Sequence, residues 1–187
     1  MERSEAWAFL AEWTPSEALR RHALSVEAAM RAYARHYGED EELWGLAGLL
    51  HDFDYERHPT LDLHPQAGEP FLRERGVPEA VIYAIQAHAE HPGLPRLSAM
   101  DRALFAVDEL CGFIGAVILV RPSRTIHDVT VDSVRKKMKD KAFARAVRRE
   151  DITEGAASLG RPLDDHVALV LESQRAIAHL IDPPRRP

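Results

Sequence analysis

Cysteine, lysine and long apolar segments are scarce in this 187-residue sequence. Its one cysteine, Cys111, cannot form an internal disulfide or a thiolate zinc site, so histidine and carboxylate would have to hold any metal. The longest apolar stretch, around 113–120, is far shorter than the roughly 18 residues of a membrane-spanning helix, and the N-terminus lacks the basic region of a signal peptide. We therefore expect a cytoplasmic protein without a membrane partner.

The composition is that of an ordinary globular protein of about one domain, with 45% hydrophobic and 29% charged residues. The net charge of −6 argues against general or sequence-specific binding to nucleic acid. Charge is nevertheless unevenly distributed, because residues 121–149 hold ten Lys or Arg, including all four lysines, against three Asp. This segment indicates either a solvated helix face or a local need for positive potential.

Apolar residues recur at intervals of three and four in segment after segment, whereas the two-residue alternation of strands is hard to find. We therefore predict an all-α fold, a helical bundle in a single domain. Gly38 is placed to end the first long helix, and Ser98 with Asp101 resembles a capping box for a later one. Helices are expected at 16–36, 41–50, 64–76, 78–88, 98–118, 132–148, 151–159 and 162–181, with a loop at 53–63.

Ionisable residues on otherwise apolar helix faces carry the most information, because burying such a group is costly unless it is paired or bound to a metal. His22, His88 and Asp108 each lie at helical spacing from apolar residues, and His51 with Asp52 follows the apolar run 46–50. One such histidine alone is more often a hydrogen-bonded core residue than a ligand. Several helices that each present a His or Asp inward, however, are where bundles build metal sites. The set predicts a site for a divalent metal.

The ordered set of His22, the pair His51-Asp52 and the distant Asp108, in a helical chain, resembles the HD-domain superfamily of metal-dependent phosphohydrolases. The resemblance covers about residues 16–120. It implies that these four residues bind one divalent metal ion.

A subset of this superfamily holds a second metal, bridged by the Asp of the pair, and His64 and His88 match the additional ligands of that subset. Where the cyclic-dinucleotide phosphodiesterase branch has two adjacent histidines, this sequence has Ala89 after His88, and His91 is a candidate substitute. The glycine-tyrosine-proline signature of that branch is also absent, so cyclic-di-GMP is not the expected substrate. The implied cofactor is one or two divalent ions per chain, drawn from Mn, Fe, Ni, Mg, Co or Zn.

Segments 108–113 and 133–143 resemble a small bacterial branch of predicted HD hydrolases, which extends the resemblance over most of the chain. We therefore expect one HD-type domain over residues 1–187. Its metal-binding core would lie at about 16–120, with C-terminal helices at about 130–181 packed on it.

The implied reaction is hydrolysis of a nucleotide or another small phosphate ester by a metal-activated water, with Asp52 at the centre of the catalytic site. Asp54 and Glu56 follow the His-Asp pair and are candidate proton-transfer groups, with solvated loop acids as the alternative that is the more common case. The candidates for binding the substrate phosphate are the cations Arg121, Arg124, Lys137 and Lys141.

Two other functions stay open for the same set of ligands. One is a di-iron oxygenase of small molecules, and the other is a non-catalytic regulatory module that only binds metal. The oligomeric state is also open, with a homodimer as one interpretation. The apolar N-terminal residues, which include Trp7 and Trp13, could cap the bundle or contact a partner.

Overall fold

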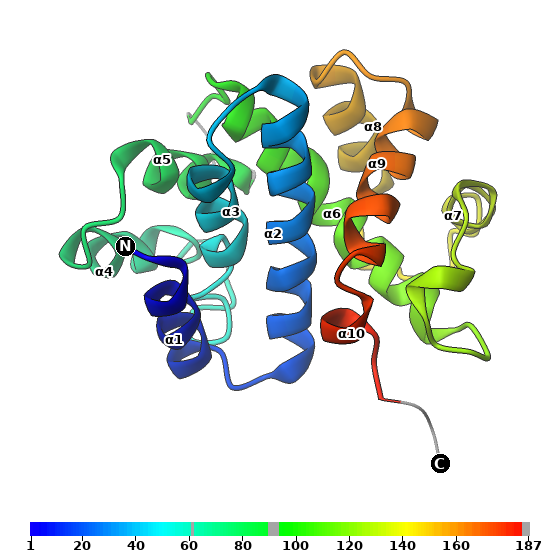
Figure 1. Ribbon diagram of the computed structural model, residues 1–187, viewed down its shortest axis with the longest axis horizontal. Helices are drawn as coiled ribbons and strands as arrows, with labels where there is room; N and C mark the ends of the chain where they lie inside the picture. The colour runs from blue at the N-terminus through cyan, green and yellow to red at the C-terminus, as the bar shows by residue number, and fades with distance from the viewer. Residues whose placement is uncertain (61, 90–93, 185–187) are drawn as a thin grey trace.

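The computed structural model describes residues 1–60, 62–89 and 94–184, and within these residues it contains helices and turns but no strand (Figure 1). The all-α prediction is therefore confirmed. Two short 3-10 helices, η1 (Gln66–Gly68) and η2 (Ile126–Asp128), interrupt the series. The α-helices are α1 (Arg3–Trp13), α2 (Glu17–Tyr37), α3 (Glu41–Leu50), α4 (Glu69–Glu74), α5 (Glu79–His88), α6 (Ala99–Leu119), α7 (Val131–Met138), α8 (Arg149–Ser158), α9 (Leu163–Arg175) and α10 (Ala178–Ile181).

Helices α2 and α3 form a tight hairpin that brings two predicted ligands close together. The predicted stop at Gly38 is confirmed, since this residue adopts the left-handed conformation (φ 71°) and the Asp40 side chain then caps α3. The two helices pack backbone to backbone at Gly48, where an added Cβ would lie 2.9 Å from the Cα of Glu27. This close approach places His22 of α2 opposite the end of α3.

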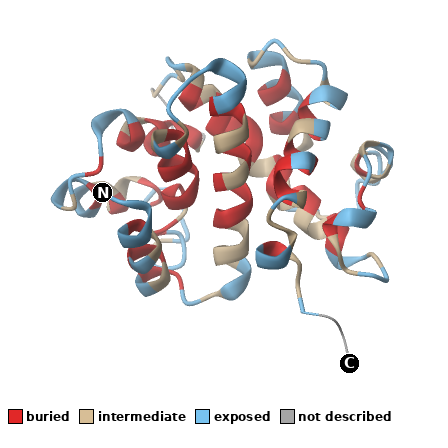
Figure 2. Ribbon diagram, in the orientation of Figure 1, coloured by how far each residue is buried: buried red, intermediate tan, exposed pale blue. Residues whose placement is uncertain are grey.

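Helix α6 is the central element of the fold and packs against α2, α5, α8 and α9. It runs behind α2 in Figure 1, and Figure 2 shows that the helix faces turned toward this region are buried. The predicted capping box of Ser98 and Asp101 is confirmed at its start. Fully buried side chains such as Leu104, Leu110 and Phe113 line it, and each stabilises the fold by about 1.5–3 kcal/mol relative to an exposed position.

His166 connects α9 to both α2 and α6. The Tyr33 hydroxyl donates to its Nδ1 (2.5 Å), and its Nε2 donates to the carbonyl oxygen of Ala106 (2.9 Å). Burial lowers the pKa of His166 to about 4, because the charged imidazolium would lose its hydration. A neutral histidine thus holds three helices together.

Three predicted helices are wrong in extent. The helix expected from 64 begins only at Glu69, and Pro70 fits the first turn of this later helix because it lacks an N–H group. The helix expected at 132–148 ends at Met138, because the guanidinium of Arg149 binds the carbonyls of Phe143, Ala144 and Val147 in a series of turns. The last expected helix is divided into α9 and α10 without a Gly or Pro at the break.

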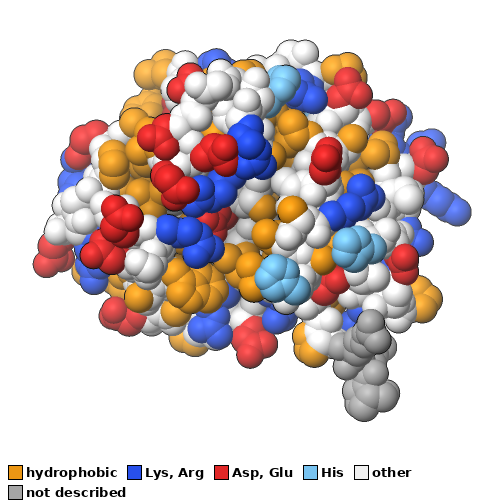
Figure 3. Space-filling model, in the orientation of Figure 1, with side chains coloured by type: hydrophobic (Ala, Val, Ile, Leu, Met, Phe, Trp, Pro, Cys, Tyr) orange, Lys and Arg blue, Asp and Glu red, His pale blue; other side chains and the backbone are white. Residues whose placement is uncertain are grey.

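No helix in the described part of the chain is long and apolar enough to cross a membrane. On the face drawn in Figure 3, acidic and basic side chains are interleaved rather than gathered by sign.

Candidate metal centre

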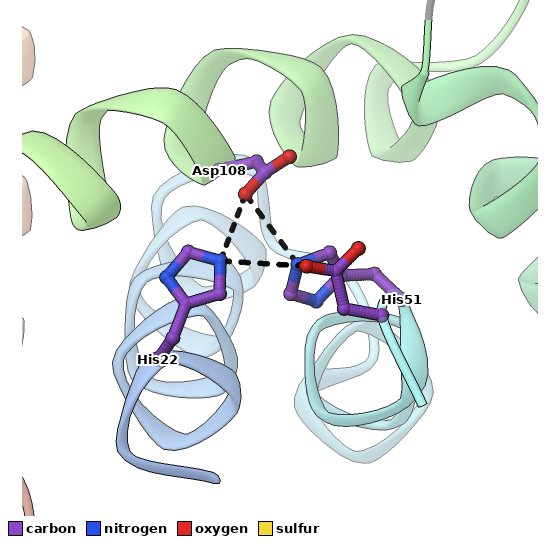
Figure 4. Close-up of side chains that lie close together, drawn as sticks. His22, His51 and Asp108 are labelled. Carbon is purple, nitrogen blue, oxygen red and sulfur yellow. Dashed lines mark hydrogen bonds and ion pairs between the residues drawn. The ribbon is translucent and has the colours of Figure 1, made fainter. Parts of the chain in front are cut away.

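Six of the predicted ligands form two adjoining groups inside the bundle, although they come from five parts of the chain. His22 lies in the second turn of α2, and Asp108 lies midway along α6. His51 follows the last residue of α3 and Asp52 comes next, while His88 is the last residue of α5. The sixth, His64, lies in the turns before η1. Figure 4 shows His22, His51 and Asp108 pointing toward one another from three helices.

The first group comprises His22, His51, Asp52 and Asp108, whose potential ligand atoms all lie within 4.8 Å of one another. His22 Nε2 is 2.9 Å from Asp108 Oδ1 and 3.9 Å from Asp52 Oδ2. His51 Nε2 is 3.4 Å from the same two carboxylate oxygens. The two imidazole Nε2 atoms therefore face the same pair of oxygens.

The second group comprises Asp52, His64 and His88, which also lie within 4.8 Å of one another. It uses the other oxygen of Asp52, since His64 Nε2 is 3.1 Å and His88 Nε2 is 3.4 Å from Oδ1. Asp52 thus presents one carboxylate oxygen to each group. This is the arrangement in which a carboxylate can bridge two cations.

Backbone carbonyls at helix ends orient two of these imidazoles. The Nδ1 of His51 donates to the carbonyl of Gly48 (2.8 Å), and that of His88 donates to the carbonyl of Ile85 (2.5 Å). Both carbonyls belong to the last turn of their helix, where they lack an intrahelical partner. Each bond holds the proton on Nδ1 and leaves the lone pair of Nε2 directed at the carboxylates.

A carboxylate orients the third imidazole. Asp54 is fully buried, and its Oδ1 accepts a hydrogen bond of 2.7 Å from His64 Nδ1. The resulting chain runs from Asp54 through His64 to Asp52. It has the form of the carboxylate–histidine–metal arrangement, in which the outer carboxylate raises the basicity of the ligand.

The charges of the cluster stabilise one another. Burial alone would lower the pKa of His51, but Asp52 and Asp108 outweigh it and hold this pKa well above the usual value. Burial would likewise raise the pKa values of both aspartates, yet the surrounding imidazoles hold them below the ordinary range. The pKa of His64 rises to about 9, because its bonds to Asp52 and Asp54 exceed the effect of burial.

The residues present fit a divalent metal. His51 Nε2 is buried and makes no hydrogen bond within the described residues, although two carboxylate oxygens face it at 3.4 Å. That distance is long for a hydrogen bond and suits groups that face a common centre. Imidazole nitrogens and carboxylate oxygens without thiolate are the donors that Fe, Mn, Ni and Zn accept.

A pocket of about 490 Å³ opens over the cluster. His22, Asp52, His64, His88 and Asp108 form its floor, and its walls include three residues that the sequence did not single out: Tyr55, Glu109 and Arg148. Among the described residues that line the pocket, Arg148 is the single arginine, and there is no lysine. The backbone N–H of Arg148 donates a hydrogen bond to the carboxylate of Glu109 (3.2 Å). Burial, followed by the charge of Asp108, raises the pKa of Glu109 to about 7.

The candidate proton-transfer groups lie elsewhere than expected. Asp54 binds the Nδ1 side of His64, and it is not among the described residues that line the pocket. Its position therefore suits orientation of the His64 imidazole rather than contact with a substrate. Glu56 accepts a hydrogen bond from the backbone N–H of Ser16 at the start of α2, also outside that lining.

The candidate phosphate-binding residues also lie outside the described lining of this pocket. The Lys137 ammonium lies 4.6 Å over the ring of Phe143, and Lys141 is exposed. Arg121 lines a surface hollow formed by the segment 119–125, and Arg124 lines both this hollow and a further pocket beside His22. His91 lies outside the described residues.

The signals for the missed residues were present but weak. Glu109 is adjacent to a predicted ligand, and Arg148 belongs to the basic segment 121–149. Charge alone did not distinguish Arg148 from its nine basic neighbours in this segment, because the choice depends on how the turns before α8 fold over the cluster.

Comparison with known proteins agrees with this geometry. A model of the HD domain family matches residues 19–112, which is half of the chain and contains all six converging residues. A curated protein that matches is Ribonuclease Y of Desulfotalea psychrophila (strain LSv54 / DSM 12343), which is 32% identical over 93 residues. The match covers 49% of this chain and 18% of that protein, so the chain spans only a small part of its relative. No solved structure gives a significant match.

Proposed function

Because the chain belongs to the HD domain family, we propose that it is a metal-dependent phosphohydrolase that acts on a nucleotide or another small phosphate ester. The observation that carries this proposal is the division of Asp52 between two groups of imidazoles, each aimed through Nε2. When bound there, one or two divalent metals would supply Lewis acidity and lower the pKa of a bound water toward neutrality.

The residues of the chain hold and orient the reacting groups. His22, His51, Asp52 and Asp108 would bind one ion, and Asp52 with His64 and His88 would bind the second. A phosphate ester bound in this pocket would lie against this centre. Arg148 lines the wall, where its guanidinium Nε pairs with Asp151 (3.3 Å), and from this position it would also attract the phosphoryl oxygens.

The class of phosphate ester is part of the proposal. The name of the matched relative describes an enzyme that cleaves RNA, and the match covers a small fraction of it. The net charge of −6 favours a small substrate over a long polyanion. Phosphomonoesters and nucleotides are therefore the first substrates to examine, with an RNA oligonucleotide in the same panel.

The test combines elemental analysis of the purified protein with a hydrolysis screen in the presence of Mn, Mg, Co or Ni. Asp52→Asn should abolish hydrolysis while the protein stays folded. Glu56→Gln changes an acid four residues away that bonds to Ser16 and should leave the rate within twofold. A panel without any hydrolysis, despite full metal occupancy, would favour a regulatory module. Two irons per chain with oxygen-dependent turnover would favour an oxygenase.

A further inference from the structure

A second pocket of about 450 Å³ adjoins the metal centre. It lies between α2, α6, α9 and α10, and it shares His22 and Gly112 with the pocket over the cluster. A molecule held at the cluster could therefore extend past His22 into this space. Its volume lies within the range of about 300–1,000 Å³ that is typical of ligand sites. Much of its wall is apolar, formed by Ala18, Ala116, Ile118, Leu119 and Ile181.

Two buried donors in this second pocket lack acceptors among the described residues. Gln174 is only 1% exposed, and its Nε2 makes no hydrogen bond there. Cys111 lies beside it, but a thiol is a weak acceptor. The Nε of Arg124 is likewise buried without an acceptor. Such unpaired buried donors destabilise the empty pocket, and a ligand with acceptors would pair with them.

We propose that the second pocket binds the organic group of the phosphate ester whose phosphate lies at the metal centre. The lining selects a ring of nucleobase size, with apolar faces and carbonyl or ring-nitrogen acceptors. A plain alkyl chain would leave the donors of Gln174 and Arg124 unpaired. This assignment rests on the proposed phosphohydrolase function and adds the residues that would determine specificity.

Gly115 offers a direct way to close this pocket. It lines the pocket from α6, and a Cβ added to it would meet no atom within 4 Å. A larger side chain would therefore enter the open space without striking the backbone. Replacing a helical glycine also reduces the backbone freedom that folding must restrict, so the fold should tolerate the change.

The test measures binding of the four common ribonucleosides and of ribose to the purified protein with Mn²⁺, by isothermal titration calorimetry. Nucleosides have no phosphoester bond, so this readout does not depend on hydrolysis. We expect at least one nucleoside to bind tenfold more tightly than ribose. Gly115→Leu should raise its Kd at least fivefold, while Gly115→Ala should change it less than twofold. Gln174→Met, which keeps the volume but removes the donor, should raise the Kd as well.

The inference is overturned if no nucleoside binds more tightly than ribose, or if folded Gly115→Leu and Gln174→Met bind as the wild type does. Where hydrolysis is found, Gly115→Leu should raise the KM for the matching nucleotide and leave that for ribose 5-phosphate unchanged. Selective nucleoside binding without hydrolysis of any phosphate ester would support the assignment of the second pocket and refute the phosphohydrolase proposal. The two ideas therefore fail separately.

Discussion

Asp54→Asn tests whether this buried acid orients His64 or transfers a proton. The substitution keeps the shape of the side chain and removes its charge. In the protein, Asp54 Oδ1 accepts from His64 Nδ1 at 2.7 Å, and His64 Nε2 faces Asp52 at 3.1 Å. An amide oxygen in the same position accepts a weaker hydrogen bond and no longer stabilises positive charge on the ring.

The expected loss follows from the position of Asp54. Removing an outer carboxylate behind a ligating histidine typically costs about 10–100-fold in metal affinity. Only the group that contains His64 should be affected, because within the described residues Asp54 forms no hydrogen bond or ion pair with His22, His51 or Asp108. We therefore expect one metal to bind with its affinity unchanged and the other to bind about 10–100-fold more weakly.

Calorimetric titration with Mn²⁺, supported by elemental analysis after dialysis, measures this difference. Glu56→Gln is the matched control, because it changes a neighbouring exposed acid whose carboxylate bonds only to Ser16 within the described residues. Equal weakening of both metals, or no weakening of either, would refute the orienting role. A loss of hydrolysis with both affinities intact would instead restore the proton-transfer hypothesis for Asp54.

Three further predictions follow from single contacts. His166 has a pKa of about 4 in the fold against 6.5 for the ordinary imidazole. Between pH 6.5 and pH 4, therefore, the imidazole of His166 is protonated in the unfolded chain but not in the folded protein. The free energy of unfolding should fall by about 3 kcal/mol as the pH drops from above 6.5 toward 4. Urea unfolding of His166→Gln should lose this part of the pH dependence, and an unchanged dependence would refute it. Gly48→Ala should destabilise by about 1–2 kcal/mol, because overpacking against α2 exceeds the gain in helix propensity, whereas Gly115→Ala should stabilise by about 0.5–1 kcal/mol. If the two substitutions change the free energy of unfolding in the same direction, the close packing at Gly48 and the open space at Gly115 are not as described. Mn²⁺ at 100 times its Kd should raise the free energy of unfolding by about 2.7 kcal/mol and the Tm by about 5–10 °C. Chelation of the metal should reverse this shift in Tm, and Asp108→Asn should reduce it. If Mn²⁺ does not change the Tm, the proposed metal site is wrong.

Local chemistry explains which helices could be predicted. The starts and stops at Gly38 and Ser98 depend on residues within one turn, so the sequence contains their cause. The turns at 139–148 depend instead on Arg149, whose guanidinium binds carbonyls up to nine residues earlier. No periodicity in that segment records this contact. The start of α4 could have been predicted better, because Pro70 is a residue typical of a first helical turn and indicates a helix that begins at 69 rather than at 64.

In the candidate site, too, some residues could be predicted from the sequence and others depend on the fold. The order of His22, His51-Asp52 and Asp108 was visible because each residue interrupts an apolar helix face. The role of Asp54 was not visible, because it arises only when the turns after α3 fold His64 back onto it. The choice of Arg148 over Lys137 has the same origin, since both are basic residues of one segment and only their placement distinguishes them.

The position of the histidines at helix ends follows from backbone chemistry. The last turn of a helix has carbonyls without an intrahelical partner, and an imidazole three residues later can donate to one of them. His51 does so to Gly48 and His88 does so to Ile85, and both bonds leave Nε2 aimed at Asp52. Replacing Gly48 would therefore disturb two things at once, the packing of α3 on α2 and the carbonyl that orients His51. At both positions the helix end itself therefore supplies the carbonyl that fixes the ring of the candidate ligand.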